Sequence, residues 1–171
     1  HAEGGKINLD PLVDYDKDGA GDYYQIPKKT KKEAIIEPYE YEVGGKKILM
    51  TSLVVPVFDR NGNFIGIVGA DIEIGSLHEI YSKVKIFNSG YINLFSGAGM
   101  IVGTGSGLDI IGKNLDEIVP SREYIDGVKG SEENFTAVYT SSKTGTTYVA
   151  YGANLKIGNT DSDWATSVNI P

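Results

Sequence analysis

The chain has 171 residues, 40% of them hydrophobic, so it can bury the core of one large domain or two small ones. Sixteen Lys and Arg against 23 Asp and Glu give a net charge of −7, and no stretch interleaves basic with aromatic side chains, which excludes a nucleic-acid-binding surface. The lack of cysteine excludes thiolate metal sites and thiol nucleophiles, and no apolar run approaches the ~20 residues of a membrane-spanning helix.

The first half of the chain reads as polar loops followed by a long β-hairpin. Residues 14–22 are rich in Asp and Gly, which predicts a loop, and the basic run 28–32 is also expected to be a solvated loop. Residues 50–58 and 64–74 are apolar and β-branched and are separated by the turn residues 59–63. These two segments are therefore predicted to pair as antiparallel strands.

The second half begins with a helical pattern and continues with strands. Apolar residues recur at helical spacing over 76–84, which predicts a short amphipathic helix. Further strands are expected at 90–95, 100–103, 134–140, 146–154 and 164–170, with a helical segment at 115–119. The pattern indicates an α+β fold of two PAS-like modules in series, 1–75 and 76–171, each an antiparallel sheet flanked by helices.

A succession of short motifs resembles the double-Cache sensor domains of chemoreceptors and sensor histidine kinases. The motifs are Gly21-Asp22-Tyr23-Tyr24, Glu37-Pro38-Tyr39, the segments 50–57 and 62–72, and in the second half Gly90-Tyr91, 96–99, 111–115 and 164–171. The resemblance covers nearly the whole chain. It implies the non-catalytic, extracytoplasmic (periplasmic or extracellular) sensing part of a transmembrane receptor, with no cofactor.

The resemblance also implies an arrangement of the whole receptor. The membrane-distal Cache module, 1–75, binds the ligand and normally follows a long N-terminal helix, which is missing from this chain. The membrane-proximal module, 76–171, leads to a transmembrane helix and a cytoplasmic signalling domain, either a histidine kinase or a chemotaxis transducer. The full-length receptor is expected to be a homodimer.

Five residues are candidates for ligand binding. In the family's amino-acid-binding members, an aromatic pair, a later tyrosine and an aspartate surround the ligand. Tyr23 and Tyr24 match the pair, Tyr39 matches the tyrosine, and Asp71 matches the aspartate that holds the ligand's ammonium group. The arginine that holds the ligand's carboxylate falls at Gly21 and is absent, so the expected ligand is an amine, an amino acid or another small polar metabolite, with a free amino acid disfavoured.

The chemistry of these side chains supports the same expectation. Aromatic walls beside one carboxylate attract a cationic ligand through cation–π contacts and charge-assisted hydrogen bonds. Ser52, on the neighbouring strand, could add a hydroxyl to this site. The alternative is that these residues bind no ligand. In that case the tyrosines pack at the edge of the core and Asp71 faces solvent.

The acidic loop offers a different binding hypothesis. Asp14, Asp16, Asp18 and Asp22 have the spacing of positions 1, 3, 5 and 9 of a calcium-binding loop. Position 12 is Gln25, where such loops use a bidentate Glu. A calcium-binding or adhesive extracellular module without a small-molecule pocket is therefore the alternative to a ligand sensor.

An enzyme is disfavoured by the residues present. The only histidines are His1 and His78, and no acid–base pair is assembled. The run Gly97-Ala98-Gly99 begins like a dinucleotide fingerprint, but it joins two predicted strands instead of opening a helix.

Overall fold

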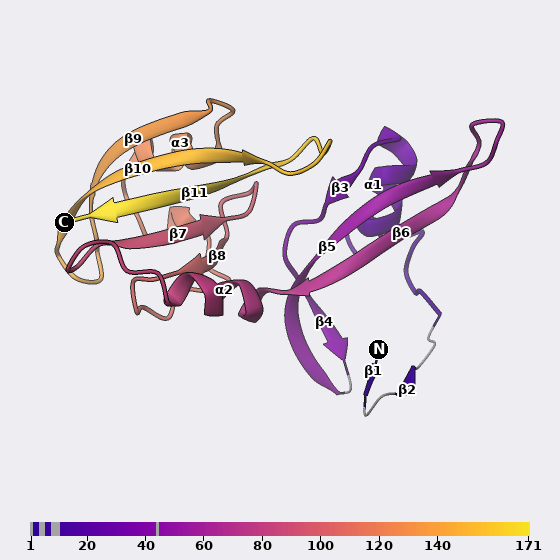
Figure 1. Cartoon of the computed structure of the whole chain (residues 1–171), viewed down its shortest axis with the longest axis horizontal. Coiled ribbons are helices and arrows are strands. Elements are labelled where there is room, and N and C mark those ends of the chain that lie inside the picture. Colours follow the sequence, from indigo (N-terminus) through magenta and orange to yellow (C-terminus); the bar gives the residue numbers. More distant parts are fainter. Residues whose placement is uncertain (1, 4–5, 8–10, 44) are drawn as a thin grey trace.

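The computed structural model describes residues 2–3, 6–7, 11–43 and 45–171. Two antiparallel sheets follow one another along the long axis of the molecule (Figure 1). A short ribbon of β1 (Ala2–Glu3) and β2 (Lys6–Ile7) lies near the N-terminus. The predicted α+β class with antiparallel sheets is confirmed.

The first sheet is built around one long strand. β5 (Lys46–Phe58) pairs with β3 (Ala34–Ile35), with β4 (Tyr39–Val43) and with β6 (Phe64–Glu73). Asp59 closes the β5–β6 turn, because its Oδ1 accepts hydrogen bonds of 2.8 Å from the N–H groups of both Asn61 and Asn63. The predicted hairpin is therefore confirmed. Helix α1 (Asp22–Thr30) packs against β5 and β6.

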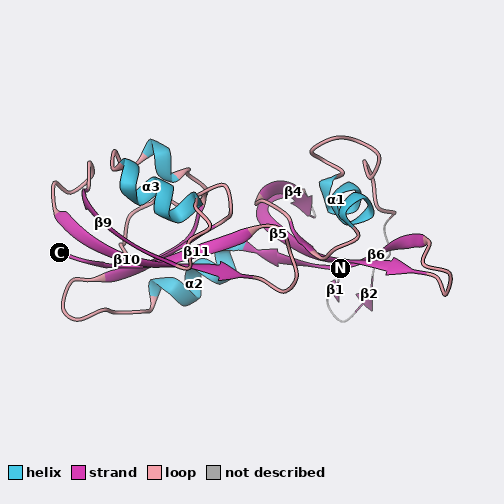
Figure 2. Ribbon diagram, turned by 90° about the horizontal axis from the view of Figure 1, so that it is seen from above, coloured by secondary structure: helices cyan, strands magenta, loops and turns pink. Residues whose placement is uncertain are grey.

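The second sheet has the strand order β8-β7-β11-β10-β9. Its main core lies under α3 (Arg122–Lys129), whose Tyr124, Ile125 and Val128 are buried. Helix α2 (Ile74–Ser82) lies on the opposite side of this sheet (Figure 2). The strands are β7 (Tyr91–Phe95), β8 (Ile101–Thr104), β9 (Asn134–Thr140), β10 (Thr147–Lys156) and β11 (Asp163–Ile170), and the 3₁₀ helix η1 (Leu115–Glu117) precedes α3.

The helices differ most from the sequence predictions. The loop predicted over 28–32 is wrong for residues 28–30, which form the last turn of α1. Helix α3 was not predicted, and α2 begins two residues earlier than expected. Among the described residues, no helix is both long and apolar enough to cross a membrane.

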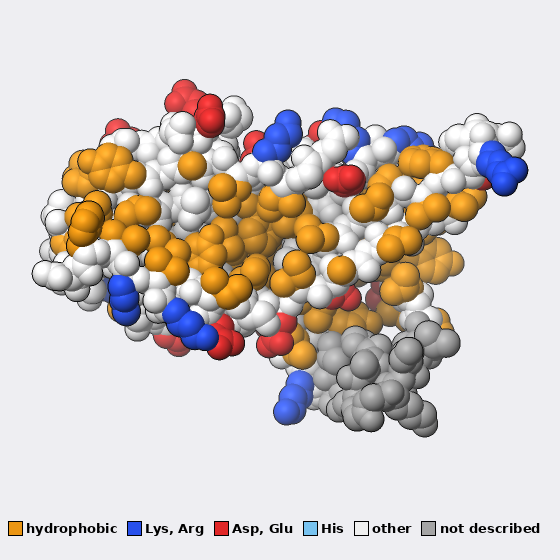
Figure 3. Space-filling model, viewed as in Figure 1, with side chains coloured by type: hydrophobic (Ala, Val, Ile, Leu, Met, Phe, Trp, Pro, Cys, Tyr) orange, Lys and Arg blue, Asp and Glu red, His pale blue; other side chains and the backbone are white. Residues whose placement is uncertain are grey.

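The two sheets share an apolar core where they meet. Ile35 and Ile74 from the first half of the chain pack with Leu94, Val102 and Trp164 from the second, and all five are buried. Figure 3 shows hydrophobic side chains gathered in the middle of the molecule, at this junction. The two sheets are therefore held together by packing and not only by the covalent link through α2.

Candidate ligand-binding site

Three of the five candidate residues form one hydrogen-bonded group. The Ser52 hydroxyl donates to Asp71 Oδ1 over 2.6 Å, and the Tyr39 hydroxyl lies 2.7 Å from Ser52 Oγ. Because Ser52 has a single hydroxyl proton, which it gives to the carboxylate, Tyr39 is the donor in the second bond. The order of donation is therefore Tyr39 to Ser52 to Asp71.

Strand register explains why these three side chains meet. Ser52 and Asp71 are direct partners across the β5–β6 pair, so their side chains emerge on the same face of the sheet. Tyr39 on β4 pairs with Met50, two residues before Ser52, and is its diagonal neighbour on that face. The group is thus placed by regular sheet geometry rather than by a loop.

The three side chains differ in burial, with Ser52 the most buried and Asp71 the most exposed. Ser52 is buried with 2% of its surface exposed, Tyr39 is half-buried, and Asp71 is exposed. Burial raises the pKa of Tyr39, a nearby Asp71 raises it further, and the bond with Ser52 opposes this change. Tyr39 therefore stays protonated at neutral pH and can donate. Within the described part of the chain, Ser52 is the only donor to Asp71, so the exposed carboxylate can accept from a ligand.

Tyr23 on α1 lies beside this group. Its ring packs with Tyr39 and Ile67 on a small cluster of the buried residues Ala34, Ile36 and Val54. Its hydroxyl donates to the backbone carbonyl of Val13 over 2.7 Å, and burial raises its pKa. The ring of Tyr23 is therefore fixed as one wall next to Tyr39.

Tyr24 points toward a different set of aromatic rings. Its ring lies edge-on to Tyr15 and Phe64, with centroids 5.6 and 5.4 Å apart, and Lys28 Nζ lies 5.4 Å from its centroid. Among the described residues, no hydrogen bond or ring contact joins Tyr24 to Tyr39. The structure thus brings Tyr23 to the hydrogen-bonded group and places Tyr24 toward the β5–β6 turn.

Tyr41 was not named from the sequence, although a local pattern marks it. It follows Tyr39 by two residues on β4, so both side chains emerge on the same face. The two rings lie edge to face with centroids 6.5 Å apart, and Tyr41 is 42% exposed. A ring with this exposure can contact a bound ligand. In the sequence, the spacing of two residues between Tyr39 and Tyr41 within a strand indicates that both rings lie on one face.

The aspartates of the acidic loop are not gathered around one point. Asp14 forms an ion pair of 2.7 Å with Lys17, and Asp22 Oδ1 accepts from the backbone N–H of Gly19 over 3.1 Å. Over the described ranges, no three Asp, Glu, His or Cys side chains are grouped as metal ligands would be. Asp14, Asp16, Asp18 and Asp22 therefore do not form a preassembled site.

Two hollows of the surface lie away from the Tyr39–Ser52–Asp71 group. One of about 450 Å³ lies between the end of α2 and the loop after β8, and its lining includes His78, Lys85 and Asp109. The other, of about 300 Å³, lies at the junction of the sheets, and Thr51 and Ile72 form part of its wall. Thr51 pairs with Ile72 in the β5–β6 ladder, next to the pair of Ser52 and Asp71. Because side chains alternate along a strand, Thr51 and Ile72 face the opposite side of the sheet. The recognition chemistry of the candidate site is therefore separate from both hollows.

The comparisons with known proteins agree with this fold. Residues 1–79 match the family described as methyl-accepting chemotaxis protein-like, first PDC sensor domain. The methyl-accepting chemotaxis protein TlpQ of Pseudomonas aeruginosa is 30% identical over 106 residues, which are 57% of this chain. The chain covers only 14% of TlpQ, so it corresponds to a small part of that receptor.

Solved structures extend the likeness to almost the whole chain. The crystallised extracellular domain of mmHK1S-Z3, which is assigned as a histidine kinase, has a TM-score of 0.81 and 30% identity and matches 98% of this chain and 58% of its own. The ligand-binding domain of the P. aeruginosa chemoreceptor PctB, solved with L-Arg, has a TM-score of 0.67 and 21% identity over 95% of this chain and 64% of its own. At that identity, PctB supports the fold alone.

Together these findings define the class of the protein. The chain has the PAS-like fold of the extracellular sensor domains of chemoreceptors and histidine kinases. Such domains are non-catalytic, which confirms the interpretation of a sensor rather than an enzyme.

Proposed function

We propose that this chain is the extracytoplasmic ligand-sensing region of a transmembrane receptor, either a sensor histidine kinase or a methyl-accepting chemotaxis protein. In this proposal the chain is a double-Cache domain, with a membrane-distal module at 1–75 and a membrane-proximal module at 76–171. The distal module binds a small amine-bearing metabolite. The match of residues 1–79 to a first PDC sensor domain supports this division.

The observation that carries the proposal is the Tyr39–Ser52–Asp71 group. Asp71 is held by Ser52 through one oxygen while its side chain stays exposed, so a ligand ammonium can form charge-assisted hydrogen bonds with it. The rings of Tyr23, Tyr39 and Tyr41 lie nearby and attract a cation through their faces. Tyr24 lies at the margin of this site, beside Phe64.

The backbone around Gly21 favours an amine over a free amino acid. A Cβ atom at Gly21 would lie 2.5 Å from the carbonyl oxygens of Asp14 and Lys17, so no side chain fits there. An arginine that binds a ligand carboxylate therefore cannot project from this position. Lys31, at the end of α1, lies over the rings of Phe58 and Phe64 instead.

The remaining parts of the receptor belong to the same proposal. By analogy with TlpQ, which is a methyl-accepting chemotaxis protein, the sensing region would be joined to transmembrane helices and a cytoplasmic signalling domain. The full-length receptor would act as a homodimer.

A thermal-shift screen tests the proposal, because a ligand that binds the native state raises the melting temperature. The panel should contain amines without a carboxylate (ethanolamine, tyramine, cadaverine), zwitterions (L-arginine, γ-aminobutyrate) and carboxylates (succinate, acetate). We expect stabilisation by at least one amine and none by the carboxylates. Stabilisation by carboxylates alone would contradict the proposed ligand class.

A further inference from the structure

Residues 32–37, which we call the connecting segment, touch both sheets. The segment contains β3, and alternate side chains from 34 to 36 contribute to different apolar clusters. Ala34 and Ile36 belong to the cluster that carries two of the candidate tyrosines. Ile35 belongs to the core shared by the two sheets. One short strand therefore links the candidate site to the junction.

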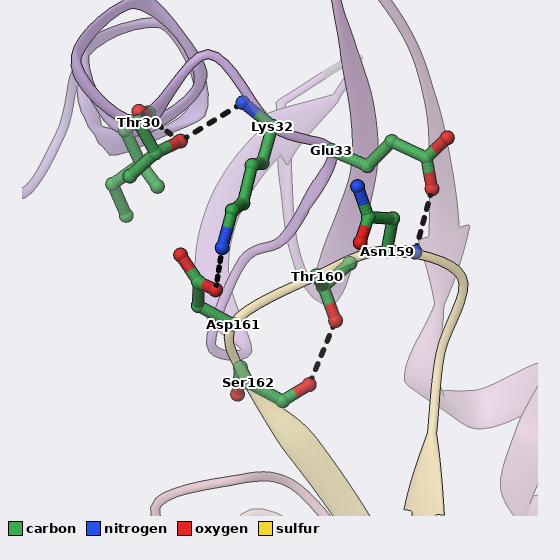
Figure 4. Close-up of polar contacts among 8 residues, drawn as sticks. Thr30, Lys32, Glu33, Asn159, Thr160, Asp161 and Ser162 are labelled. Atoms are coloured by element: carbon green, nitrogen blue, oxygen red, sulfur yellow. Dashed lines mark hydrogen bonds and ion pairs between the residues drawn. The ribbon is translucent and has the colours of Figure 1, made fainter.

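Two glutamates of the segment bind backbone groups of the second sheet. Glu33 Oε2 accepts from the N–H of Asn159, in the β10–β11 loop, over 3.0 Å (Figure 4). Glu37 Oε1 accepts from the N–H of Ala98, in the β7–β8 turn, over 3.0 Å. Carboxylate acceptors make these bonds stronger than neutral ones. With Ile35, these glutamates place every second residue of the segment against the second sheet.

Lys32 adds an ion pair to the same loop. Its Nζ lies 2.7 Å from Asp161 Oδ1 (Figure 4), but the two side chains are 47% and 61% exposed. An ion pair with this exposure contributes little to stability. The two glutamates and Ile35 are therefore the main contacts.

Glycines opposite the two carboxylates make the close approach possible. A Cβ at Gly158, which has φ +56°, would collide with the Glu33 carboxylate. A Cβ at Gly97 would lie 3.0 Å from Glu37 Oε1. The two loops of the second sheet are thus fitted closely to the connecting segment.

The segment is also tied to the backbone of the candidate site. The N–H of Ile36 donates to the carbonyl of Ser52 over 2.9 Å, and the Thr51 hydroxyl donates to the carbonyl of Ile36 over 2.5 Å. A displacement of β5 at Ser52 must therefore move Ile36. Because packed strands do not deform continuously, Glu33, Ile35 and Glu37 must follow.

We propose that the connecting segment is the coupling element between the candidate site and the second sheet. A change at Tyr39 or Ser52 passes through Ala34 and Ile36 to the backbone, and from there through Glu33 and Glu37 to the two loops of the second sheet. The coupling depends on the proposed function in one respect only, which is the chemical class of the ligand that occupies the site.

Hydrogen exchange in the whole chain tests the coupling without a ligand. The perturbation is Tyr39→Ala, and the readout is the exchange rate of backbone amides in β10 and β11, beyond the contacted loops. We expect Tyr39→Ala to change these rates about fivefold or more, the lower end of typical coupling between sites. In a chain carrying both Glu33→Ala and Glu37→Ala, the same substitution should change them by less than about twofold.

Two further variants make the test specific. Glu40→Ala with Glu42→Ala removes two glutamates of β4 and should leave the response to Tyr39→Ala as in the unmodified chain. Glu33→Gln with Glu37→Gln keeps the acceptor oxygens and should retain most of the coupling. An equal response with and without Glu33 and Glu37, or no response in the unmodified chain, would overturn the coupling. Failure of amine binding would overturn only the proposed function.

Discussion

Ser52 and Asp71 are direct partners across the β5–β6 pair, and the Ser52 hydroxyl donates to Asp71 Oδ1 over 2.6 Å. The bond orients the carboxylate before any ligand arrives, which reduces the conformational entropy that binding would otherwise cost. Because the Ser52 hydroxyl donates its hydrogen bond to Asp71, the Ser52 oxygen can accept a hydrogen bond from Tyr39. Substitutions of Tyr39 and Asp71 are therefore expected to weaken amine binding for different reasons.

Tyr39→Phe removes the bond to Ser52 and keeps the ring. We expect amine affinity to fall by at most about fivefold to tenfold, because Ser52 then lacks the donor that orients its hydroxyl toward Asp71, and one neutral hydrogen bond is worth about 1 kcal/mol. Calorimetric titration of both proteins with the best amine of the panel measures the change. Tyr41→Phe is the matched control. The Tyr41 ring lies on the same face, and among the described residues its hydroxyl forms no hydrogen bond. Equal losses in the two variants would contradict the assigned role of the Tyr39 hydroxyl.

Ile74→Ala tests whether the two sheets unfold together. Ile74 is fully buried in the core shared by both sheets, so its truncation should lower the free energy of unfolding by about 2–5 kcal/mol. Urea denaturation followed by circular dichroism should still show one transition. Ile80→Ala, at a position of the same helix that is 62% exposed, should change the free energy by less than about 0.5 kcal/mol. Two separate transitions in the unmodified chain would show that the shared core does not couple the sheets.

Two tyrosines of the second sheet, Tyr91 (partly buried) and Tyr139 (buried), predict a loss of stability at alkaline pH. Burial raises the pKa of Tyr91 to about 12 and also raises the pKa of Tyr139, whose hydroxyl bonds to Tyr91 over 2.6 Å. Above the ordinary pKa of 10, the unfolded chain releases protons that the folded chain retains. This contribution to stability is complete below pH 10 and is lost as the pH rises through the folded values.

Urea denaturation measures this effect as the slope of the unfolding free energy against pH between pH 10 and about 12, compared with the flat region below pH 10. Tyr139→Phe should make the decline less steep, by up to about 1.4 kcal/mol per pH unit for one group. Tyr151→Phe should leave the slope unchanged, because Tyr151 is 54% exposed. An unchanged slope in Tyr139→Phe would exclude Tyr139 as a source of the alkaline loss.

The acidic loop predicts no dependence on calcium. Asp14 is paired with Lys17, and the other aspartates are not grouped with it among the described residues. Neither millimolar calcium nor a chelator should change the melting temperature. A rise with calcium that Asp16→Asn with Asp18→Asn abolishes would revive the alternative of a calcium-binding module.

The parts of the fold that depend on local sequence were predictable. The β5–β6 hairpin follows from two β-branched runs and a turn held by Asp59, and the strands of the second sheet follow from the same kind of pattern. Helix α3 was also readable, because Ser121 caps the N–H of Tyr124 and buried side chains recur at helical spacing behind it.

Helix α1 could not be read from local sequence. It contains Pro27 in its interior, and Gly21 at its N-cap offers no side-chain bond. Its stability comes from docking on β5 and β6, and its Pro27 is buried. The roles of Glu33 and Glu37 were equally hidden, because their partners lie far away along the chain, at Asn159 and Ala98.

The central claim is that Asp71 holds the ammonium group of the ligand. Calorimetric titration of the unmodified chain, Asp71→Asn and Glu42→Gln with the same amine tests it most directly, because both substitutions remove one negative charge from exposed positions of the first sheet. We predict that Asp71→Asn weakens binding at least about tenfold without a change in melting temperature, while Glu42→Gln binds like the unmodified chain. Equal affinity in all three proteins would contradict the account.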